Sequence, residues 1–290
     1  MDLPSAFVIG LLHPGEMGAA VGRCLTEAGY TVLWASEGRG PETAARARDA
    51  GLADAGTAAE MAERADLILS ICPPHAALDT AWGVQGFAGL YVDANAISPA
   101  TAREVALMVE EGGATYIDGG IIGLPPVKPG HTRLYLSGER ADTVRRLFDG
   151  TPLEARVIGG GAFSASAVKM AYASWTKGSA ALLLAARSLA RAEGVEDALA
   201  AEWTLSQPGL ADRSERAARS ATTKGWRWVA EMEEIAASMA ADGLPDGFHQ
   251  AAAEIFRRSP RAEPDRTGPG PGSQILDQVL SAIAGEAARD

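Results

Sequence analysis

The sequence is poor in cysteine: its 290 residues include only Cys24 and Cys72, and its four histidines are scattered along the chain. Two cysteines do not make a disulfide framework, and the histidines do not have the spacing of metal ligands. We therefore expect both cysteines to be core residues, and we expect no metal site.

The chain also lacks a dense cluster of lysine or arginine and any apolar run long enough to cross a bilayer. Its formal net charge of -11 repels nucleic acid and anionic membranes. We do not expect the first residues to form an export signal, because Asp2 and Pro4 stand where basic and apolar regions are required. We expect a cytoplasmic protein that acts on a small-molecule substrate, with neither nucleic acid nor membrane as a partner.

What the first half does have is a regular alternation of apolar, strand-like segments with helix-like segments. Strands are predicted over residues 6–10, 30–35, 65–72, 90–95, 116–118 and 133–137. Helices are predicted over residues 41–50, 75–82 and 100–111, and residues 119–130, rich in glycine and proline, are predicted to form a loop. This alternation is typical of a doubly wound, Rossmann-type α/β domain.

The second half is rich in alanine and leucine and predicts helices throughout. They are expected over residues 165–192, 195–206, 211–222, 226–241, 248–258 and 273–288. Residues 259–272 combine proline, glycine and charge without periodicity, which predicts a mobile surface loop. We expect a dinucleotide-binding domain over residues 1–160 and an all-α domain over residues 161–290, which completes a substrate cleft and mediates a homodimer.

The junction of the first strand and first helix is the most informative segment. A helix that begins near Gly15 leaves backbone N–H groups unpaired at a partly positive end, where the phosphates of a dinucleotide bind. We expect Gly10 to permit the exit from the strand, Gly15 to admit the phosphates, and Gly18 to allow close packing. Because four residues separate Gly10 from Gly15, the loop should be longer than in the usual G-x-G-x-x-G. The residues expected to contact the cofactor here are Gly10, Leu12, Gly15, Glu16, Met17 and Gly18.

The residues after the second strand favour NADP over NAD. An NAD enzyme carries an acidic residue there to bind the ribose 2′-hydroxyl, whereas this chain has Ser36 at the aligned position. Ser36 and Arg39 suit a 2′-phosphate, although Glu37 beside them repels it. NAD therefore stays possible, and Glu37 and Arg39 are alternatively solvated loop charges.

Four segments, in order, resemble the β-hydroxyacid dehydrogenase superfamily, whose fold is that of 6-phosphogluconate dehydrogenase. They are the Gly10–Gly18 turn, residues 93–99, residues 118–138, and the three glycines 159–161 that lead to Lys169. The resemblance covers roughly residues 7–178. It implies that Asn95 contacts substrate and nicotinamide, that Gly123 belongs to the substrate loop, and that Lys169 transfers a proton.

Further site residues follow from this resemblance and from helical spacing. Cys72 and Pro73 are expected at the cofactor, while Tyr172 and Thr176 share a helix face with Lys169. Partial burial would lower the pKa of Lys169 and suit it to acid–base work; the alternative is a lysine on a solvated helix face. The residues expected to contact substrate are Ser98, Gly123, Leu124, Thr176 and Trp228, with Lys169, Asn95 and Tyr172 as the catalytic set.

The sequence departs from that superfamily at two points. The lysine is normally followed by two asparagines, whereas this chain has Tyr172 and Ala173, and the substrate loop carries three prolines. These departures indicate a divergent branch with its own helical C-terminal domain. We expect reversible hydride transfer at a carbon bearing oxygen; the alternatives are imine reduction and a non-catalytic NADP-binding sensor or scaffold.

Overall fold

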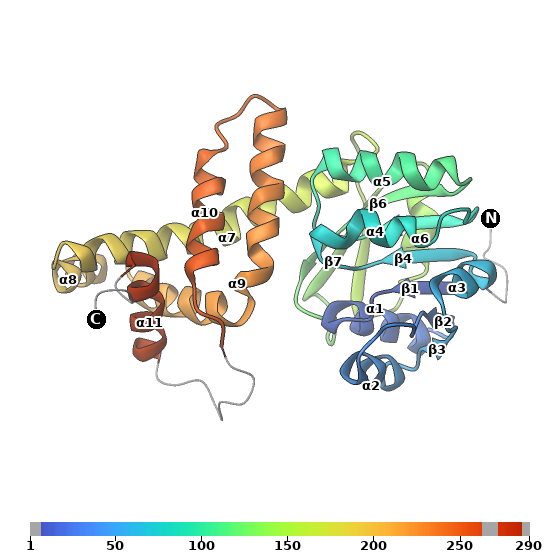
Figure 1. Cartoon of the computed structure of the whole chain (residues 1–290), viewed down its shortest axis with the longest axis horizontal. Coiled ribbons are helices and arrows are strands. Elements are labelled where there is room, and N and C mark those ends of the chain that lie inside the picture. Colours follow the sequence, from blue (N-terminus) through green and yellow to red (C-terminus); the bar gives the residue numbers. More distant parts are fainter. Residues whose placement is uncertain (1–6, 263–271, 286–290) are drawn as a thin grey trace. The chain divides into compact units, whose positions relative to one another are not determined.

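The computed structural model describes residues 7–262 and 272–285. The chain divides into two compact units between Met170 and Ala171, within helix α7 (Ser164–Ala192) (Figure 1). The predicted domain boundary near residue 160 stays a prediction, because a helix shared by two units does not mark where either would fold alone.

The first unit is built on one eight-stranded sheet with the order β3-β2-β1-β4-β5-β6-β7-β8. Neighbouring strands run parallel, except that β6 and β7 are antiparallel. The strand order reverses between β1 and β4, the arrangement of a doubly wound sheet. The strands are β1 (Val8–Leu12), β2 (Thr31–Trp34), β3 (Ala53–Asp54), β4 (Leu67–Ser70), β5 (Leu90–Asp93), β6 (Thr115–Gly123), β7 (Thr132–Ser137) and β8 (Leu153–Val157).

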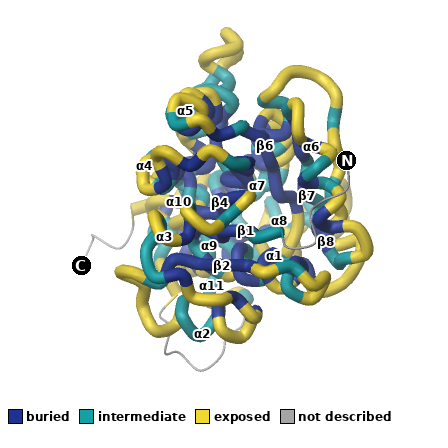
Figure 2. The backbone as a smooth tube through the Cα atoms, turned by 90° about the vertical axis from the view of Figure 1, so that its right-hand side faces the viewer, coloured by how far each residue is buried: buried dark blue, intermediate teal, exposed yellow. Residues whose placement is uncertain are grey.

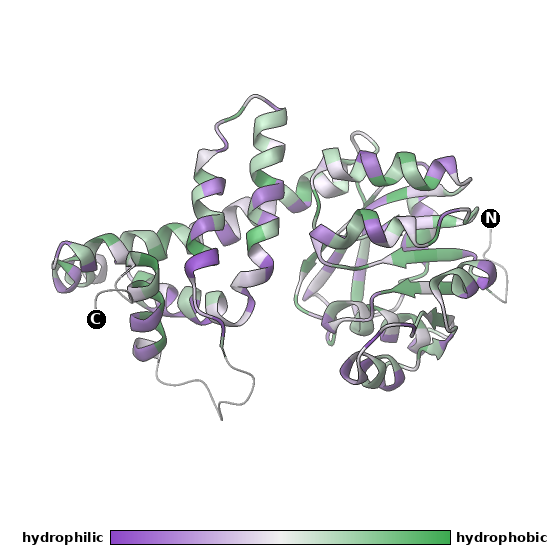
Figure 3. Cartoon of the chain, in the orientation of Figure 1, coloured by the Kyte–Doolittle hydropathy of each residue, from purple (hydrophilic) through white to green (hydrophobic). Residues whose placement is uncertain are grey.

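Helices cover both faces of this sheet, and the central strands are buried on both sides (Figure 2). Alternate strand residues therefore enter two separate cores: Ile9 and Leu11 belong to one, and Ile68 and Tyr91 to the other. The central strands β1, β4 and β5 are accordingly mostly apolar (Figure 3). The helical elements are α1 (Glu16–Glu27), α2 (Pro41–Asp49), α3 (Ala58–Arg64), η1 (Pro74–Ala76), α4 (Ala77–Trp82), α5 (Pro99–Glu111) and α6 (Ala141–Arg146).

The second unit is helical in its described part. After the remainder of α7 come α8 (Glu196–Ser206), α9 (Leu210–Ala241), α10 (Gly247–Arg258) and α11 (Gly272–Ala284). Helices α10 and α11 both pack against α9. The predicted fold class, a Rossmann-type α/β domain with an all-α C-terminal domain, is confirmed.

Several predicted boundaries are wrong. Strand β1 continues past Gly10 to Leu12, and β6 continues past Asp118 to Gly123, so the loop before β7 is shorter than predicted. The two helices predicted over residues 211–222 and 226–241 form the single helix α9, in which Gly225 is a buried helix residue and does not break the helix. A Cβ there would make only ordinary contacts, 3.7 Å from Ala221 and Phe256. Helix α11 ends at Ala284, and most of the loop predicted over 259–272 lies outside the described residues.

Within residues 7–262 and 272–285, no helix combines the length and the apolar composition needed to cross a bilayer.

Candidate functional site

The candidate site lies at a row of four residues that pair with one another across neighbouring strands, which we call the register row. Leu12, Ser70, Asp93 and Asp118 are paired in succession on β1, β4, β5 and β6. These four strands are parallel, so the chain that leaves each of them emerges at one edge of the sheet. Ligands of doubly wound sheets bind at this edge where the strand order reverses, which is here between β1 and β4.

The turn that leaves β1 contains only three residues, His13, Pro14 and Gly15, before α1 begins at Glu16. His13 has φ +63 and is the one non-glycine residue with positive φ in the described part of the chain. Gly15 is the N-cap of α1 and supplies no side-chain cap. A Cβ at Gly18 would lie 2.6 Å from the carbonyl oxygen of His13, so only glycine lets the helix fold back onto the turn.

Two sequence expectations about this turn are wrong. Gly10 does not open it, because Gly10 lies inside β1, where a Cβ would meet the Met61 side chain at 3.1 Å. The turn is also not longer than usual: residues 13–18 have the G-x-G-x-x-G length, with His13 in the place of the first glycine. Counting back from Gly18 and Gly15 would have identified His13 from the sequence.

Two arginines approach the turn from the segments after β2. Arg39 Nη1 lies 3.1 Å from His13 Nδ1, and Arg46 Nε lies 3.5 Å from the carbonyl oxygen of Pro14. Burial lowers the pKa of His13, and the positive charges of Arg39, Arg46 and His75 lower it further. Arg39 was expected at the 2′-phosphate of the cofactor, which stays a prediction, and its contact with the turn was not anticipated. Arg46, on α2, was missed because nothing in the sequence places it at the turn.

These features fit a dinucleotide. The first N–H groups of α1 have no carbonyl partner within the helix and no side-chain cap, and two guanidinium groups add positive charge beside them. Ser36, half-buried, and the exposed Glu37 both bind the Gly56 carbonyl oxygen through their backbone N–H groups, which holds the segment after β2 in place.

The carboxyl ends of β4 and β5 are joined through the side chain of Asn95. Its Oδ1 accepts from the backbone N–H of Cys72 at 2.6 Å, and its Nδ2 donates to Ser70 Oγ at 3.1 Å. Asn95 is buried, so this amide fixes the turn that carries Cys72 and Pro73. Its contact with nicotinamide or substrate stays a prediction. Burial raises the pKa of Cys72 to about 11, which agrees with a core cysteine and not a nucleophile.

Two buried carboxyl groups lie side by side in the register row. Asp93 Oδ1 accepts from the Asn95 backbone N–H at 3.0 Å, and its Oδ2 is buried with no partner among the described residues. Burial raises the pKa of Asp93 to about 7, and the charge of Asp118 contributes. Burial also raises the pKa of Asp118, although hydrogen bonds from Ser166 and Ser137 oppose this. Neither carboxyl was anticipated as a site residue.

Lys169 reaches the same edge of the sheet from the second turn of α7. Its Nζ donates to the carbonyl oxygen of Ile121 at 2.8 Å, three positions beyond Asp118 on β6. The helix lies directly on this strand, since a Cβ at Gly120 would be 2.7 Å from the Ala165 carbonyl oxygen and 3.1 Å from Lys169 Cβ. Gly120 therefore sets the distance between the strand and the lysine.

Other predicted substrate residues of the first unit serve visibly structural roles. Ser98 is buried and is the N-cap of α5, where its Oγ accepts from the Thr101 backbone N–H at 3.1 Å. Gly123 ends β6 with φ +131, and a Cβ there would collide with the His131 carbonyl oxygen. The adjoining Leu124 is 62% exposed. Substrate contacts by these residues stay predictions.

The remaining predicted residues belong to the helical unit. Tyr172 is 48% exposed, Thr176 Oγ1 donates to the Tyr172 carbonyl oxygen at 3.0 Å, and Trp228 packs edge-on against Phe256. Here Ser174 Oγ lies 2.8 Å from Nε2 of the buried His249. Their roles also stay predictions.

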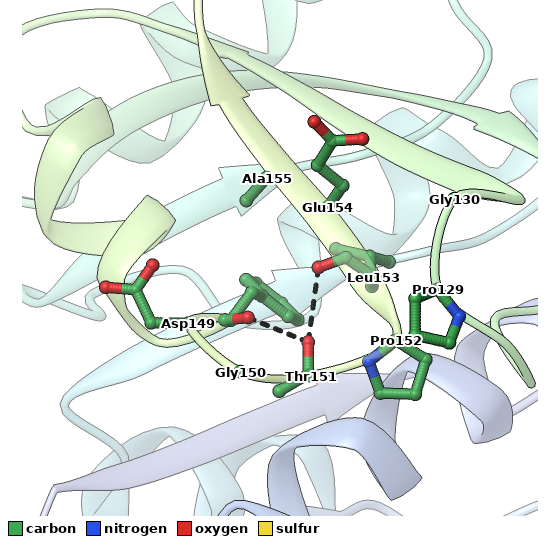
Figure 4. A pocket seen from close by; sticks show the side chains of 10 residues that line it. Pro129, Gly130, Asp149, Gly150, Thr151, Pro152, Leu153, Glu154 and Ala155 are labelled. Carbon is green, nitrogen blue, oxygen red and sulfur yellow. Dashed lines mark hydrogen bonds between the residues drawn. The ribbon is translucent and has the colours of Figure 1, made fainter.

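A surface hollow lies at the β8 end of the sheet (Figure 4). Thr151 Oγ1 stands within hydrogen-bond distance of the Phe148 and Leu153 carbonyl oxygens in its wall. Its charged lining residues are Asp149 and Glu154, so the hollow suits an anionic cofactor poorly.

Two family matches cover most of the chain. Residues 7–144 match the family described as the NAD binding domain of 6-phosphogluconate dehydrogenase. Residues 190–259 match a family described as a domain of unknown function, DUF1932.

Two relatives are similar in sequence. The uncharacterized 28.5 kDa protein in the 7S RNA 5′ region of Methanothermus fervidus is 29% identical over 193 residues, 66% of this chain and 74% of that protein. The mitochondrial 3-hydroxyisobutyrate dehydrogenase of Mus musculus is 28% identical over 129 residues, 42% of this chain and 38% of that enzyme.

Solved structures share the fold over nearly the whole chain. The 3-hydroxyisobutyrate dehydrogenase of Mycobacterium tuberculosis, with L-serine, has a TM-score of 0.68 at 19% identity and covers 98% of this chain and 99% of its own. The reductive aminase of Aspergillus terreus, in complex with NADPH and ethyl levulinate, has a TM-score of 0.54 at 22% identity, with 94% and 99% covered. The chain thus combines an NAD-binding domain of the 6-phosphogluconate dehydrogenase type over residues 7–144 with a helical DUF1932 region over residues 190–259.

Proposed function

We propose that this protein is an NAD(P)-dependent oxidoreductase that transfers hydride reversibly between nicotinamide and a small hydroxy or keto substrate, with Lys169 as the general acid and base. One observation carries the proposal. The β1–α1 turn directly follows Leu12 of the register row. Lys169 Nζ donates to the carbonyl oxygen of Ile121, which lies three residues beyond Asp118 of the same row. The amine and the dinucleotide turn therefore belong to the same edge of one sheet.

The dinucleotide, when bound, supplies the hydride acceptor or donor. Gly15 and Gly18 let the backbone of α1 approach its phosphates, and Asn95 holds the Cys72 turn beside them. Lys169 takes the hydroxyl proton of the substrate as a neutral amine, or donates a proton as an ammonium in the reverse direction. The Ile121 carbonyl oxygen orients this amine before substrate binds.

NADP is the proposed preference. Arg39 and Arg46 flank the turn, and Ser36 occupies the position where an acidic residue would select NAD. A guanidinium forms two parallel hydrogen bonds to a phosphate, which favours the 2′-phosphorylated cofactor. NADPH should bind more tightly than NADH, and Arg39→Ala should reduce this preference about tenfold.

Imine reduction is the second candidate, because a reductive aminase shares the fold and Ala173 stands where the superfamily's polar residue is expected. Lys169 is the discriminating residue. A lysine needed to move a hydroxyl proton is indispensable for alcohol oxidation, whereas an imine already protonated in water needs it less.

A homodimer is part of the proposal. Helix α8 has no buried residue, and Leu205, Leu189 and Leu182 are 80%, 65% and 55% exposed. Apolar side chains presented this way by helices α7 and α8 are suited to a second copy of the chain. Light scattering on the purified protein would give twice the chain mass; a monomer at micromolar concentration would contradict this.

The test is turnover of NADPH and NADH with panels of keto acids, semialdehydes and cyclic imines, for the wild type and for Lys169→Ala. We expect carbonyl reduction to fall by about 10²–10⁴-fold in the variant while dinucleotide affinity stays unchanged. Lys224→Ala is the matched control and should retain full activity. Imine turnover that survives Lys169→Ala would support the reductase alternative. Tight dinucleotide binding without turnover of any panel member would support a sensor.

A further inference from the structure

We propose that His13 is a direct ligand of a dinucleotide phosphate and that its imidazole takes up a proton when the phosphate binds. This inference rests on the proposed function, because it requires the dinucleotide to occupy the β1–α1 turn. It adds a side chain to a cradle that glycine-rich turns otherwise build from backbone alone.

The backbone of His13 gives the first reason. Its φ of +63 lies in the left-handed region, where glycine is the residue without strain, and no other non-glycine residue among 7–262 and 272–285 adopts a positive φ. Histidine is one of the few side chains tolerated there. A side chain kept in a strained conformation at a ligand-binding turn indicates that the side chain is used.

The direction of the imidazole gives the second reason. A Cβ placed on Gly15 would lie 3.5 Å from His13 Cδ2 and 3.6 Å from His13 Nε2, so this edge of the ring lies beside the N-cap of α1. The opposite nitrogen, Nδ1, lies 3.1 Å from Arg39 Nη1. Because a guanidinium can only donate, Nδ1 accepts and Nε2 carries the proton. A donor is therefore presented beside the N–H groups that start the helix.

The charges around His13 explain why a proton would move. Arg39 and Arg46 from the β2–α2 region and His75 from η1 all oppose a positive imidazole, and with burial they hold the pKa of His13 below its usual value. The acidic residues of the adjoining segments, Glu16 and Glu37, are exposed. These groups therefore favour the neutral ring in the free protein. A phosphate beside it favours the charged form.

Protonation of Nδ1 also has a consequence for Arg39. A doubly protonated imidazole has no acceptor left, so the guanidinium must leave Nδ1. Once released, Arg39 can turn to the bound dinucleotide. Proton uptake and recruitment of the arginine are therefore one event, with the proton supplied by the solvent.

The experiment is calorimetry of NADH and NADPH binding to the full chain, in buffers of different ionisation enthalpy between pH 6 and 8. We compare the wild type with His13→Asn, which tolerates the left-handed conformation and cannot become charged, and with His13→Gly. NADH is the cleaner probe, because the 2′-phosphate of NADPH itself titrates near pH ~6. His131→Asn, at an exposed histidine, is the matched control, and melting temperatures verify that each variant is folded.

We expect the wild type to take up a fraction of a proton per dinucleotide and to bind about tenfold more tightly at pH 6 than at pH 8, as for a charged hydrogen bond gained. Both effects should disappear in His13→Asn and His13→Gly and persist in His131→Asn. If the His13 variants lose these effects with both dinucleotides, the pyrophosphate is the partner of His13. If they lose them with NADPH alone, the 2′-phosphate is the partner.

Unchanged proton uptake and affinity in both His13 variants would overturn the inference and leave the proposed function intact. If the wild type bound neither dinucleotide, the proposed function itself would fail, and the inference with it.

Discussion

The carboxylate of Asp118 accepts two hydrogen bonds from Ser166, one from its backbone N–H at 2.8 Å and one from its hydroxyl at 2.5 Å. Ser166 lies in the first turn of α7, and Lys169 lies three residues further along. A buried residue of β6 therefore fixes the start of the helix that carries the proposed catalytic lysine. An anion at this end of a helix is also favoured by the helix dipole.

We predict that Asp118→Asn destabilises the protein by about 1–3 kcal/mol. Asparagine replaces one of the two carboxylate oxygens with an NH₂ group. This group would face a donor of Ser166 or Ser137, which then loses its acceptor. Urea unfolding would measure the loss. Ser166→Ala removes one donor and no acceptor, so its effect should be smaller. Equal stability of Asp118→Asn and the wild type would show that the carboxylate does not secure α7.

Asp93 gives a prediction about pH. Burial raises its pKa to about 7, whereas in the unfolded chain it ionises near pH ~4. At pH values between these two pKa values, Asp93 is protonated in the folded protein and ionised in the unfolded chain. The free energy of unfolding therefore falls as pH rises from about 4 to about 7.

Asp93→Asn removes this titration and keeps the side-chain shape. The free energy of unfolding of the wild type, minus that of the variant, should decrease by on the order of 2–4 kcal/mol as pH rises from about 4 to about 7. Urea unfolding at several pH values measures the difference, in which the other titrating groups largely cancel. A difference that did not vary with pH would mean that Asp93 ionises normally in the fold.

The sequence predicted the elements whose cause is local. Apolar runs identified β1, β4 and β5, and the Ala/Leu-rich segment identified α7, because burial on both faces and helix propensity are visible in single segments. The two-residue strand β3 and the edge strand β8 were missed. Both residues of β3 are exposed, only Leu153 of β8 is buried, and the pairing of both strands depends on neighbours distant in the chain.

The candidate site was predictable to a similar extent. Gly15 and Gly18 follow from motif spacing, Arg39 from its place after the second strand, and Lys169 from the family resemblance. The register row could not be predicted, since pairing of Ser70 with Asp93 and of Asp93 with Asp118 exists only once the sheet has formed. Glycine was equally ambiguous. Gly10 and Gly18 look alike in sequence, yet one faces the flexible Met61 side chain and the other a fixed backbone carbonyl.

Gly18 and Gly15 should therefore respond differently to alanine. Gly18→Ala places a Cβ 2.6 Å from a backbone oxygen, so the turn must shift, and we expect a loss of about 1–3 kcal/mol together with weaker dinucleotide binding. Gly15→Ala meets only the His13 ring at 3.5 Å, an ordinary contact. Its stability should fall by less than about 1 kcal/mol.

Dinucleotide binding should nevertheless weaken in Gly15→Ala, since the added methyl group would stand where the phosphates approach the helix in the proposed complex. Thermal melting and fluorescence titration with NADPH separate the two effects. Tight binding by a folded Gly15→Ala variant would place the phosphates away from this turn.

The helical unit contains a nearly buried ion pair between Lys177 and Glu231, whose side chains are 16% and 11% exposed. The ammonium also lies over the Trp228 ring, 5.5 Å from its centroid. Removing one partner leaves the other charge buried, so Glu231→Gln should cost about 3–5 kcal/mol. The double variant Lys177→Met with Glu231→Leu should have a free energy of unfolding near that of the wild type, because it leaves no unpaired charge buried.

The exposed pair Arg257–Glu233, with side chains 50% and 55% exposed, is the control, and Glu233→Gln should cost less than about 1 kcal/mol. A double-mutant cycle by urea unfolding measures the coupling, and a double variant as unstable as Glu231→Gln would mean that the two charges act through other groups.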